Sequence, residues 1–138
     1  MTSYVIKAAI TDRDAAAWTF TDAKTMYGGK AAQEGDKVYI FASETSGGAG
    51  LLARGVVVTA EPTPRLTGVE RQTPRVSLTV QRTGTALRPL GRRELKGFAD
   101  RDDGRPETEL NFKLYRQATD KLVGISHAAA GFLESFFR

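Results

Sequence analysis

The residues most suggestive of chemistry are SETSGGAG at positions 43–50, a loop of glycines and small polar side chains between two apolar runs. Such loops cradle phosphate in nucleotide-binding proteins, because their backbone N–H groups approach the ligand closely. A P-loop needs Lys and then Ser or Thr after its last glycine, whereas Leu51 and Leu52 follow Gly50. A dinucleotide-binding turn opens a helix, whereas this loop precedes a strand-like run. We therefore predict the turn of a hairpin, which could still lie against a ligand.

Side chains that could catalyse a reaction are few. The chain has no cysteine and a single histidine, His127, which makes a metal centre improbable. Ser126 precedes His127, but adjacent residues of a helix do not face one another, so a nucleophile–base pair is not expected there. Asp102 and Asp103 lie in a charged stretch typical of a solvated turn. We therefore predict that the protein is not an enzyme and holds neither a metal nor a cofactor.

Positive charge is concentrated in the middle of the chain. The formal net charge is +4, and residues 65–93 contain one acid, Glu70, and seven arginines, at positions 65, 71, 75, 82, 88, 92 and 93. Such a segment attracts polyanions, and arginine suits bidentate contact with phosphate. An ordinary solvated strand face explains the same arginines equally well.

The elements that must position these residues are mostly strands. Apolar runs rich in β-formers predict strands over residues 4–10, 37–43, 51–60, 75–82 and 122–125. Gly55 inside the third run indicates a bulge or bend. In the fourth run Val76, Leu78 and Val80 alternate with polar residues, which indicates a half-buried strand.

Helices are predicted to be short. Residues 11–22 are interpreted as irregular, followed by a helical turn that Asp22 caps and Gly28 ends. Residues 88–98 predict a short helix, 98–109 a charged loop and 111–119 an amphipathic helix. Ser126 caps a final helix to about residue 137, with Ala129, Phe132, Leu133 and Phe136 as its buried stripe.

These elements add up to one small α+β domain. The 138 residues, 41% of them hydrophobic, suffice for a single core, so residues 1–138 are expected to form one domain. About five or six strands without an alternating βαβ rhythm favour a small, strongly bent mixed β-barrel with two or three short helices.

A family resemblance agrees with this fold. The strand YVIKAA, the tryptophan in AWTF, the run GDKVYIFASE, the Gly-rich turn and the strand GLLARGVVV resemble the EVE domain of the PUA-like superfamily. YTH domains share this layout. The closing segment NFKLYRQATDKLVGISHAAAGFLESFF resembles that of EVE-like bacterial proteins. The resemblance spans nearly the whole chain, and residues 65–109 contribute little to it.

The resemblance implies a PUA-like barrel that binds DNA or RNA and accepts a modified base, turned out of its strand, in an aromatic-walled pocket. Trp18 matches the tryptophan after the first strand and would form a pocket wall, with Thr19 beside it contacting the base. Ser43 and Glu44 close a strand that lines the pocket in this superfamily. The candidates for the remaining aromatic walls are Phe20, Tyr27 and Tyr39.

The residues themselves are compatible with such a site. An extruded base needs an aromatic platform, a few polar atoms and positive charge for the flanking phosphates. Trp18 lies among polar residues rather than in an apolar run, which favours a functional role over a core role. Arg75, Arg82 and Arg116 are the candidate phosphate contacts, although Arg116 could equally pair with an acid of the domain itself.

The predicted function is therefore a nucleic-acid-binding module that reads a modified or flipped-out base. The alternative is a regulatory domain on the same barrel that binds a small molecule or a protein. No run approaches the ~20 apolar residues of a membrane helix, and the N-terminal residues do not resemble a signal peptide. Because cysteine is absent as well, we expect a cytoplasmic location without a membrane partner.

Overall fold

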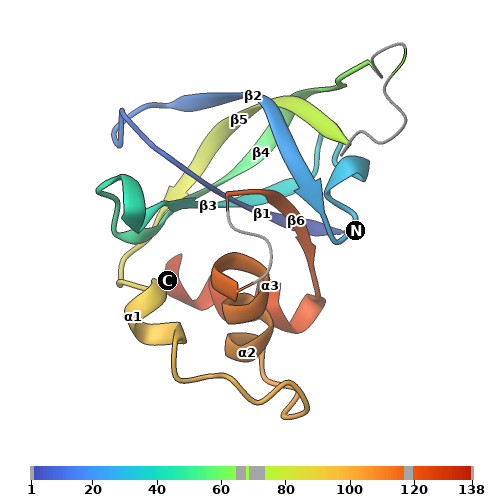
Figure 1. Cartoon of the computed structure of the whole chain (residues 1–138). Coiled ribbons are helices and arrows are strands. Elements are labelled where there is room, and N and C mark those ends of the chain that lie inside the picture. Colours follow the sequence, from blue (N-terminus) through green and yellow to red (C-terminus); the bar gives the residue numbers. More distant parts are fainter. Residues whose placement is uncertain (1, 65–67, 69–73, 117–119, 138) are drawn as a thin grey trace.

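A computed structural model describes residues 2–64, 68, 74–116 and 120–137. Six strands close into a barrel in the order β1-β3-β4-β5-β2-β6, and helices gather on one side of it (Figure 1). Two neighbouring pairs, β1–β3 and β2–β6, are parallel, and the other four pairs are antiparallel. The strands are β1 (Ser3–Ala8), β2 (Ala17–Met26), β3 (Lys37–Ala42), β4 (Gly50–Pro62), β5 (Arg75–Thr85) and β6 (Leu122–Ile125).

Strands β1 and β3 separate two hydrophobic cores. Tyr4 and Ile6 of β1 lie in the core inside the barrel, whereas Val5 lies in a second core between the barrel wall and the helices. In β3, Ile40 faces inward and Tyr39 faces the helices. Because side chains alternate along a strand, apolar residues on both faces mean that both faces are covered. The predicted central strand at residues 37–43 is thereby confirmed.

Strand β2 differs from the prediction. The strand covers Ala17–Met26. It therefore includes the second half of the stretch predicted to be irregular and the residues predicted to form a helical turn. Trp18 and Phe20 point into the barrel core between exposed neighbours, which is the alternation of a half-buried strand. The sequence obscures this strand because Asp22 has a positive φ of 51° and interrupts the register with β5 between Phe20 and Ala23.

Strands β4 and β5 confirm their predicted patterns. The register between them shifts between Arg54 and Gly55, so the predicted bulge is present. A Cβ on Gly55 would overlap the Gln81 carbonyl oxygen of β5, which explains why glycine stands there. In β5, Val76 and the two alternating apolar residues after it are almost completely buried.

The helical layer comprises α1 (Arg92–Leu95), α2 (Pro106–Asn111), the π-helical turn η3 (Phe112–Arg116), α3 (His127–Glu134) and the 3₁₀ turn η4 (Ser135–Phe137). The short helix within residues 88–98 is confirmed. The segment predicted as a charged loop already becomes helical at Pro106, a residue suited to the first helical position. Part of the helix predicted for 111–119, residues 117–119, lies outside the described residues.

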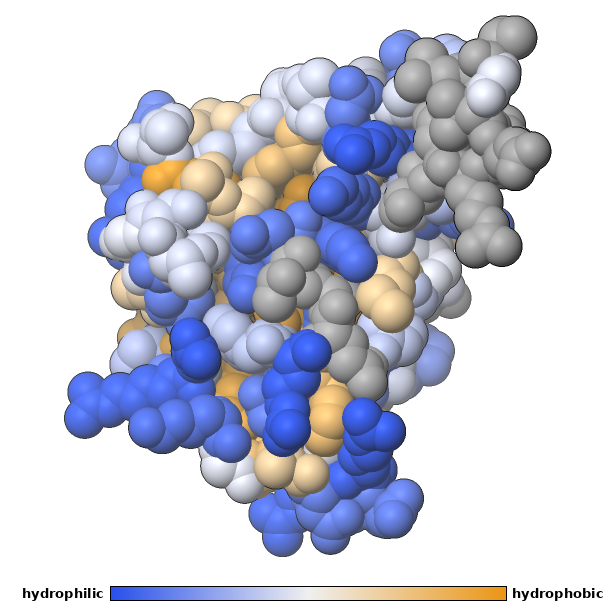
Figure 2. Space-filling view, viewed as in Figure 1, coloured by the Kyte–Doolittle hydropathy of each residue, from blue (hydrophilic) through white to orange (hydrophobic). Residues whose placement is uncertain are grey.

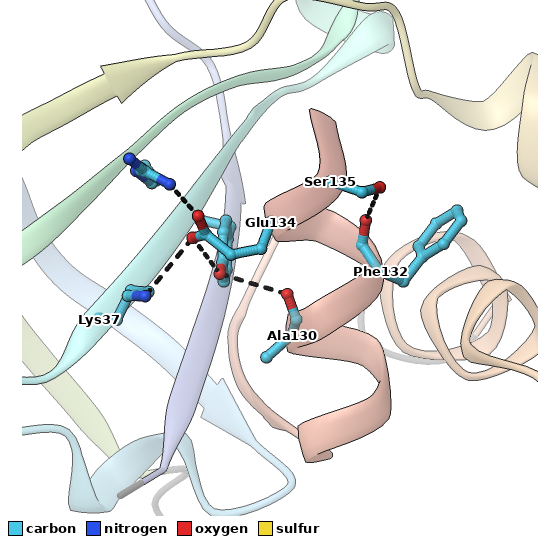
Figure 3. Close-up of polar contacts among 7 residues, drawn as sticks. Lys37, Ala130, Phe132, Glu134 and Ser135 are labelled. Carbon is cyan, nitrogen blue, oxygen red and sulfur yellow. Dashed lines mark hydrogen bonds and ion pairs between the residues drawn. The ribbon is translucent and has the colours of Figure 1, made fainter. Parts of the chain in front are cut away.

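Helix α3 confirms the predicted cap and is fastened to the barrel by a charged cluster. Ser126 Oγ accepts a hydrogen bond from Ala129 N at 3.1 Å. At the other end of the helix, Glu134 pairs with Lys37 Nζ at 3.4 Å and with Arg54, and accepts a hydrogen bond from the Tyr39 hydroxyl at 2.9 Å (Figure 3). Residues from β3 and β4 thus converge on one carboxylate of the helix.

The structure therefore confirms the predicted α+β class and the small mixed barrel with short helices. Within the described ranges, no helix combines the length and the apolar character needed to span a bilayer.

Candidate functional site

A cavity of about 230 Å³ lies where β1 and β3 end, between the barrel and the helical layer. Side chains from separate parts of the chain build it: from β1 and the turn after β3, from the start of α1, from Tyr115 of η3, and from Asp120 before β6. Its lining residues are Lys7, Ser43, Glu44, Thr45, Arg92, Tyr115 and Asp120.

Lys7 is the central residue of this cavity. It is only 5% exposed and lies two residues after Val5, so it belongs to the face of β1 that the helices cover. Its Nζ lies 4.3 Å from the centroid of the Tyr115 ring, a cation–π contact. No described residue accepts a hydrogen bond from this ammonium group. Its three donors are therefore available to a ligand in the cavity.

Burial lowers the pKa of Lys7 below its ordinary value, and the nearby carboxylates of Asp120 and Glu44 oppose that shift only in part. Lysine is rarely this buried without a hydrogen-bonding partner, because removing an ammonium group from water costs free energy. A polar ligand that accepts hydrogen bonds would offset this cost.

Glu44 fixes the geometry of the cavity wall. Its Oε2 accepts hydrogen bonds from the Tyr115 hydroxyl at 2.9 Å and from Arg92 N at 2.7 Å, so it connects the turn after β3 with η3 and α1. A Cβ on Gly91 would lie 2.7 Å from Glu44 Oε2, so a larger residue there would displace this carboxylate. Burial, followed by the charge of Glu44, raises the pKa of Tyr115 far above its usual range. Tyr115 therefore stays a neutral donor at any ordinary pH.

The Gly-rich segment is the predicted hairpin turn. It joins the antiparallel strands β3 and β4 through a 3₁₀ turn, η2 (Glu44–Ser46), and Gly47 follows with a φ of 86°. Ser43 is buried at the start of this turn, and its Oγ lies 2.9 Å from Thr45 Oγ1. The turn thus contributes three side chains, those of Ser43, Glu44 and Thr45, to the cavity.

A second, wider hollow adjoins the cavity. It has a volume of about 610 Å³ and shares Glu44 and Arg92 with the first. Arg92 is exposed, as are Arg93 and Lys96, which line the same hollow. Hydrophilic side chains cover the region of α1 in the space-filling view (Figure 2). A buried cation in a small cavity is thereby flanked by an exposed basic rim.

Of the six residues predicted for the base pocket, the structure brings two, Ser43 and Glu44, to this cavity. Thr19 lies on the outer face of β2 and its Oγ1 is 3.1 Å from Thr79 Oγ1. Phe20 lies in the barrel core, and Tyr27 lines a different cavity. Tyr39, the further aromatic candidate, packs between the barrel and α3.

Trp18 occupies a different environment from the one its sequence neighbours indicated. It is 9% exposed and belongs to the barrel core rather than to a polar loop. Its Nε1 donates to the Asp12 carbonyl at 2.8 Å, and the Arg82 guanidinium lies 4.6 Å from its ring centroid. The sequence signal for this inward position was the alternation of Trp18 and Phe20 with Thr19 and Thr21.

The predicted phosphate contacts are dispersed. Arg82 donates to the carbonyls of Ala15 and Arg13, so its guanidinium fastens the segment before β2. Arg75 donates to the Asp22 carbonyl at 3.3 Å. Arg116 is exposed and its guanidinium lies 4.9 Å from the centroid of the Phe112 ring. Among the arginines counted in the sequence, positions 65 and 71 lie outside the described residues.

Comparison with known proteins adds a fold assignment. The sequence matches no family model and no curated protein. Human THYN1, solved in complex with DNA containing 5-methylcytosine, has 13% identity over 98% of this chain and 96% of that chain, with a TM-score of 0.66. The DUF55 domain of human thymocyte nuclear protein 1 (15% identity, 96% of both chains) has a TM-score of 0.65. A hypothetical protein from Leishmania major (16% identity, 98% of this chain and 93% of that one) has a TM-score of 0.63.

The fold of the chain therefore matches the EVE-type, PUA-like barrel that the sequence resemblance implied. At these low identities the likeness establishes the fold and confirms the resemblance seen in the sequence. Within the EVE-type barrel, the cavity residues missed by sequence reasoning are Lys7, Thr45, Arg92, Tyr115 and Asp120.

A signal for one of the missed residues was present. In YVIKAA a lysine occupies the same strand face as a valine, in a strand that is apolar on both sides. Such a lysine either ends the buried part of the strand or points into a polar cavity. For Tyr115 and Asp120 the sequence offers no comparable signal.

The described residues contain no group of three or more His, Cys, Asp or Glu side chains placed to hold a metal ion. His127 begins α3 and is exposed.

Proposed function

We propose that this protein is a nucleic-acid-binding module that takes an extruded, modified base into the Lys7 cavity and does not turn it over. The observation that carries the proposal is Lys7, a residue only 5% exposed, whose ammonium group opens into a cavity of about 230 Å³ and donates a hydrogen bond to no described residue.

The chemistry of the cavity suits one edge of a base. Lys7 would donate to a ring nitrogen or carbonyl of the base, and the carboxylate of Glu44 or Asp120 would accept from its exocyclic amine. Cytosine and adenine both present such a donor beside an acceptor. The Tyr115 ring supplies the aromatic part of the wall.

The basic rim suits the flanking strand. Arg92, Arg93 and Lys96 are exposed beside the cavity mouth, where phosphates on either side of an extruded base would pass. A structural neighbour, human THYN1, binds DNA that contains 5-methylcytosine, which supports the same class of ligand for this chain.

Fluorescence anisotropy with labelled oligonucleotides tests the proposal. Matched DNA and RNA strands, single and duplex, would be compared with and without 5-methylcytosine or N6-methyladenine, at about 50 and 200 mM salt. We expect one modified strand to bind about tenfold more tightly than its unmodified partner, since a well-seated base contributes ~1–3 kcal/mol.

Variants separate the base contact from the phosphate contacts. Lys7→Met should remove the preference for the modified base and leave the weak, salt-dependent binding. Arg93→Ala with Lys96→Ala should weaken all strands alike, whereas Lys24→Ala, an exposed lysine on β2, is the matched control. Equal affinity for every modified and unmodified strand would refute base reading.

Two further observations decide between the alternatives. Modification-dependent quenching of Trp18, the only tryptophan, would place the base against β2 as the sequence predicted, rather than in the Lys7 cavity. Binding of a neutral small molecule that hardly changes with salt, without oligonucleotide binding, would favour the regulatory alternative.

A further inference from the structure

Another cavity is lined by residues of α2, η3 and the loop before α2, together with the residue after β2, and it shares no lining residue with the Lys7 cavity. Its volume is about 310 Å³, within the range of pockets that hold small ligands. Tyr27, at the end of β2, and Phe112, at the start of η3, supply its aromatic walls. Arg101 and Arg105, from the loop before α2, supply positive charge.

Aromatic rings and cations alternate around this cavity. The Arg101 guanidinium lies 5.1 Å from the centroid of Phe112, and Arg116 lies 4.9 Å from the same ring. Lys113 Nζ lies 4.8 Å from the centroid of Tyr27, which is 40% exposed. Guanidinium planes and aromatic rings are both surfaces on which nucleic-acid bases stack.

The cavity carries net positive charge, because Glu109 is the one acid in its lining and pairs with Lys113. Glu109 accepts hydrogen bonds from Ser126 N at 2.8 Å and from Ser126 Oγ, and pairs with Lys113 at 3.1 Å. Burial raises the pKa of Glu109, but these hydrogen bonds outweigh it and lower the pKa overall. Glu109 therefore remains ionised at neutral pH and neutralises Lys113.

The positive charges of the two loop arginines, Arg101 and Arg105, are not compensated by an ion pair within the described residues. Asp103, an acid two residues before Arg105, uses its carboxylate to accept from Arg105 N at 2.9 Å and from Thr108 Oγ1 at 2.8 Å. Both arginines are exposed at the cavity rim.

We propose that this cavity is a second ligand site, which binds a nucleotide by stacking its base against Phe112 or Tyr27 and pairing its phosphate with Arg101 and Arg105. The paired aromatic platforms favour a flat ligand over an acidic peptide, which would need the cations alone. The site includes Tyr27, a residue that the sequence singled out and that does not line the Lys7 cavity. The proposal stands whether or not the Lys7 cavity reads a base.

Isothermal titration calorimetry with adenosine 5′-monophosphate tests the site. We expect binding that is about tenfold weaker for adenosine, which lacks the phosphate. Arg101→Ala with Arg105→Ala should reduce affinity at least tenfold, and Phe112→Leu should reduce it while keeping an apolar side chain. Lys24→Ala, an exposed lysine on β2, is the control that should leave affinity unchanged, with circular dichroism confirming that every variant is folded.

A second measurement separates a free nucleotide from one within a strand. If adenosine 5′-monophosphate does not bind, but the double arginine variant weakens a labelled 12-mer more than Lys24→Ala does, the nucleotide belongs to a bound strand. If the double variant changes neither ligand, the proposal is wrong. It is equally wrong if a hexaglutamate peptide binds this cavity more tightly than either nucleotide ligand.

Discussion

Replacing Lys7 with methionine should stabilise the fold and abolish base recognition at the same time. Methionine fills the volume of the lysine stem without its charge. In the wild type the Lys7 ammonium group contacts the Tyr115 ring, and the charges of Asp120 and Glu44 offset part of the cost of its burial. It donates a hydrogen bond to none of the described residues. Replacing a buried ion pair with apolar side chains of similar volume is neutral to stabilising by ~1–4 kcal/mol; Lys7 is a single cation that opens into a cavity, so we expect a gain at the lower limit of this range.

The direction of the pKa shift gives this prediction a pH dependence. The pKa of Lys7 is lowered from 10.5 in the folded protein, so in the window between the two values the unfolded chain binds more protons. Stability of the wild type therefore rises with pH through that window. The destabilisation by Lys7 is fully present below the folded-state pKa and is relieved above 10.5. The advantage of Lys7→Met should accordingly be largest near neutral pH and shrink as the pH approaches 10.5.

Thermal unfolding at several pH values and anisotropy titrations would measure the two effects. At the lower limit of about 1 kcal/mol, Lys7→Met should raise Tm by about 3 °C at pH 7. Losing a charge-assisted hydrogen bond to the base should cost ~1.5–3 kcal/mol, or about a 10- to 150-fold loss of affinity for the modified strand. A lower Tm with unchanged affinity would refute the reasoning and make Lys7 a structural partner of the two carboxylates.

Three further predictions concern residues that hold the barrel and α3 together. Glu134→Gln should destabilise the fold by about 1–2 kcal/mol at pH 7, as measured by urea unfolding. Hydrogen bonds outweigh burial and lower the pKa of Glu134, so the stabilisation by its carboxylate is present above pH 4.5. The difference in stability between wild type and variant should therefore vanish as acid protonates Glu134. Gly55→Ala should cost about 1–3 kcal/mol by forcing the β4 bulge against the Gln81 carbonyl, and an unchanged urea midpoint would show that the bulge adapts. Arg82→Ala should lower stability by about 1–2 kcal/mol and leave oligonucleotide affinity unchanged; a loss of affinity in the anisotropy assay would restore Arg82 as a phosphate contact.

Most of the barrel was predictable, because its strands carry their signals locally. Residues 37–42 are apolar on both faces, β5 alternates with period two, and Gly55 marks its bulge. Strand β2 was missed because its alternation lasts only from Trp18 to Phe20 before Asp22 breaks the register. Tertiary pairing with β5 and β6, rather than local propensity, makes that segment a strand.

The candidate site was less predictable because no local motif encodes it. Ser43 and Glu44 were found through the family resemblance, whereas Lys7, Tyr115 and Asp120 meet them only through the packing of distant elements. The polar neighbours of Trp18 suggested an exposed ring, but in a half-buried strand those neighbours are the outer face. The residue types that flank an aromatic side chain therefore do not show whether it is buried, unless the strand face on which it lies is known.

The position of β6 between β1 and β2 has a consequence for biosynthesis. Residues 3–8 and 17–26 emerge early, yet each has one edge that only residues 122–125 cover. At about 5–20 residues per second, the translating ribosome needs roughly 6–24 s to proceed from the first strand to the last. Throughout that interval two strand edges remain open to foreign pairing, which is the situation that holdase chaperones relieve. The barrel and both cavities beside its helices can therefore be completed only after translation has passed residue 125.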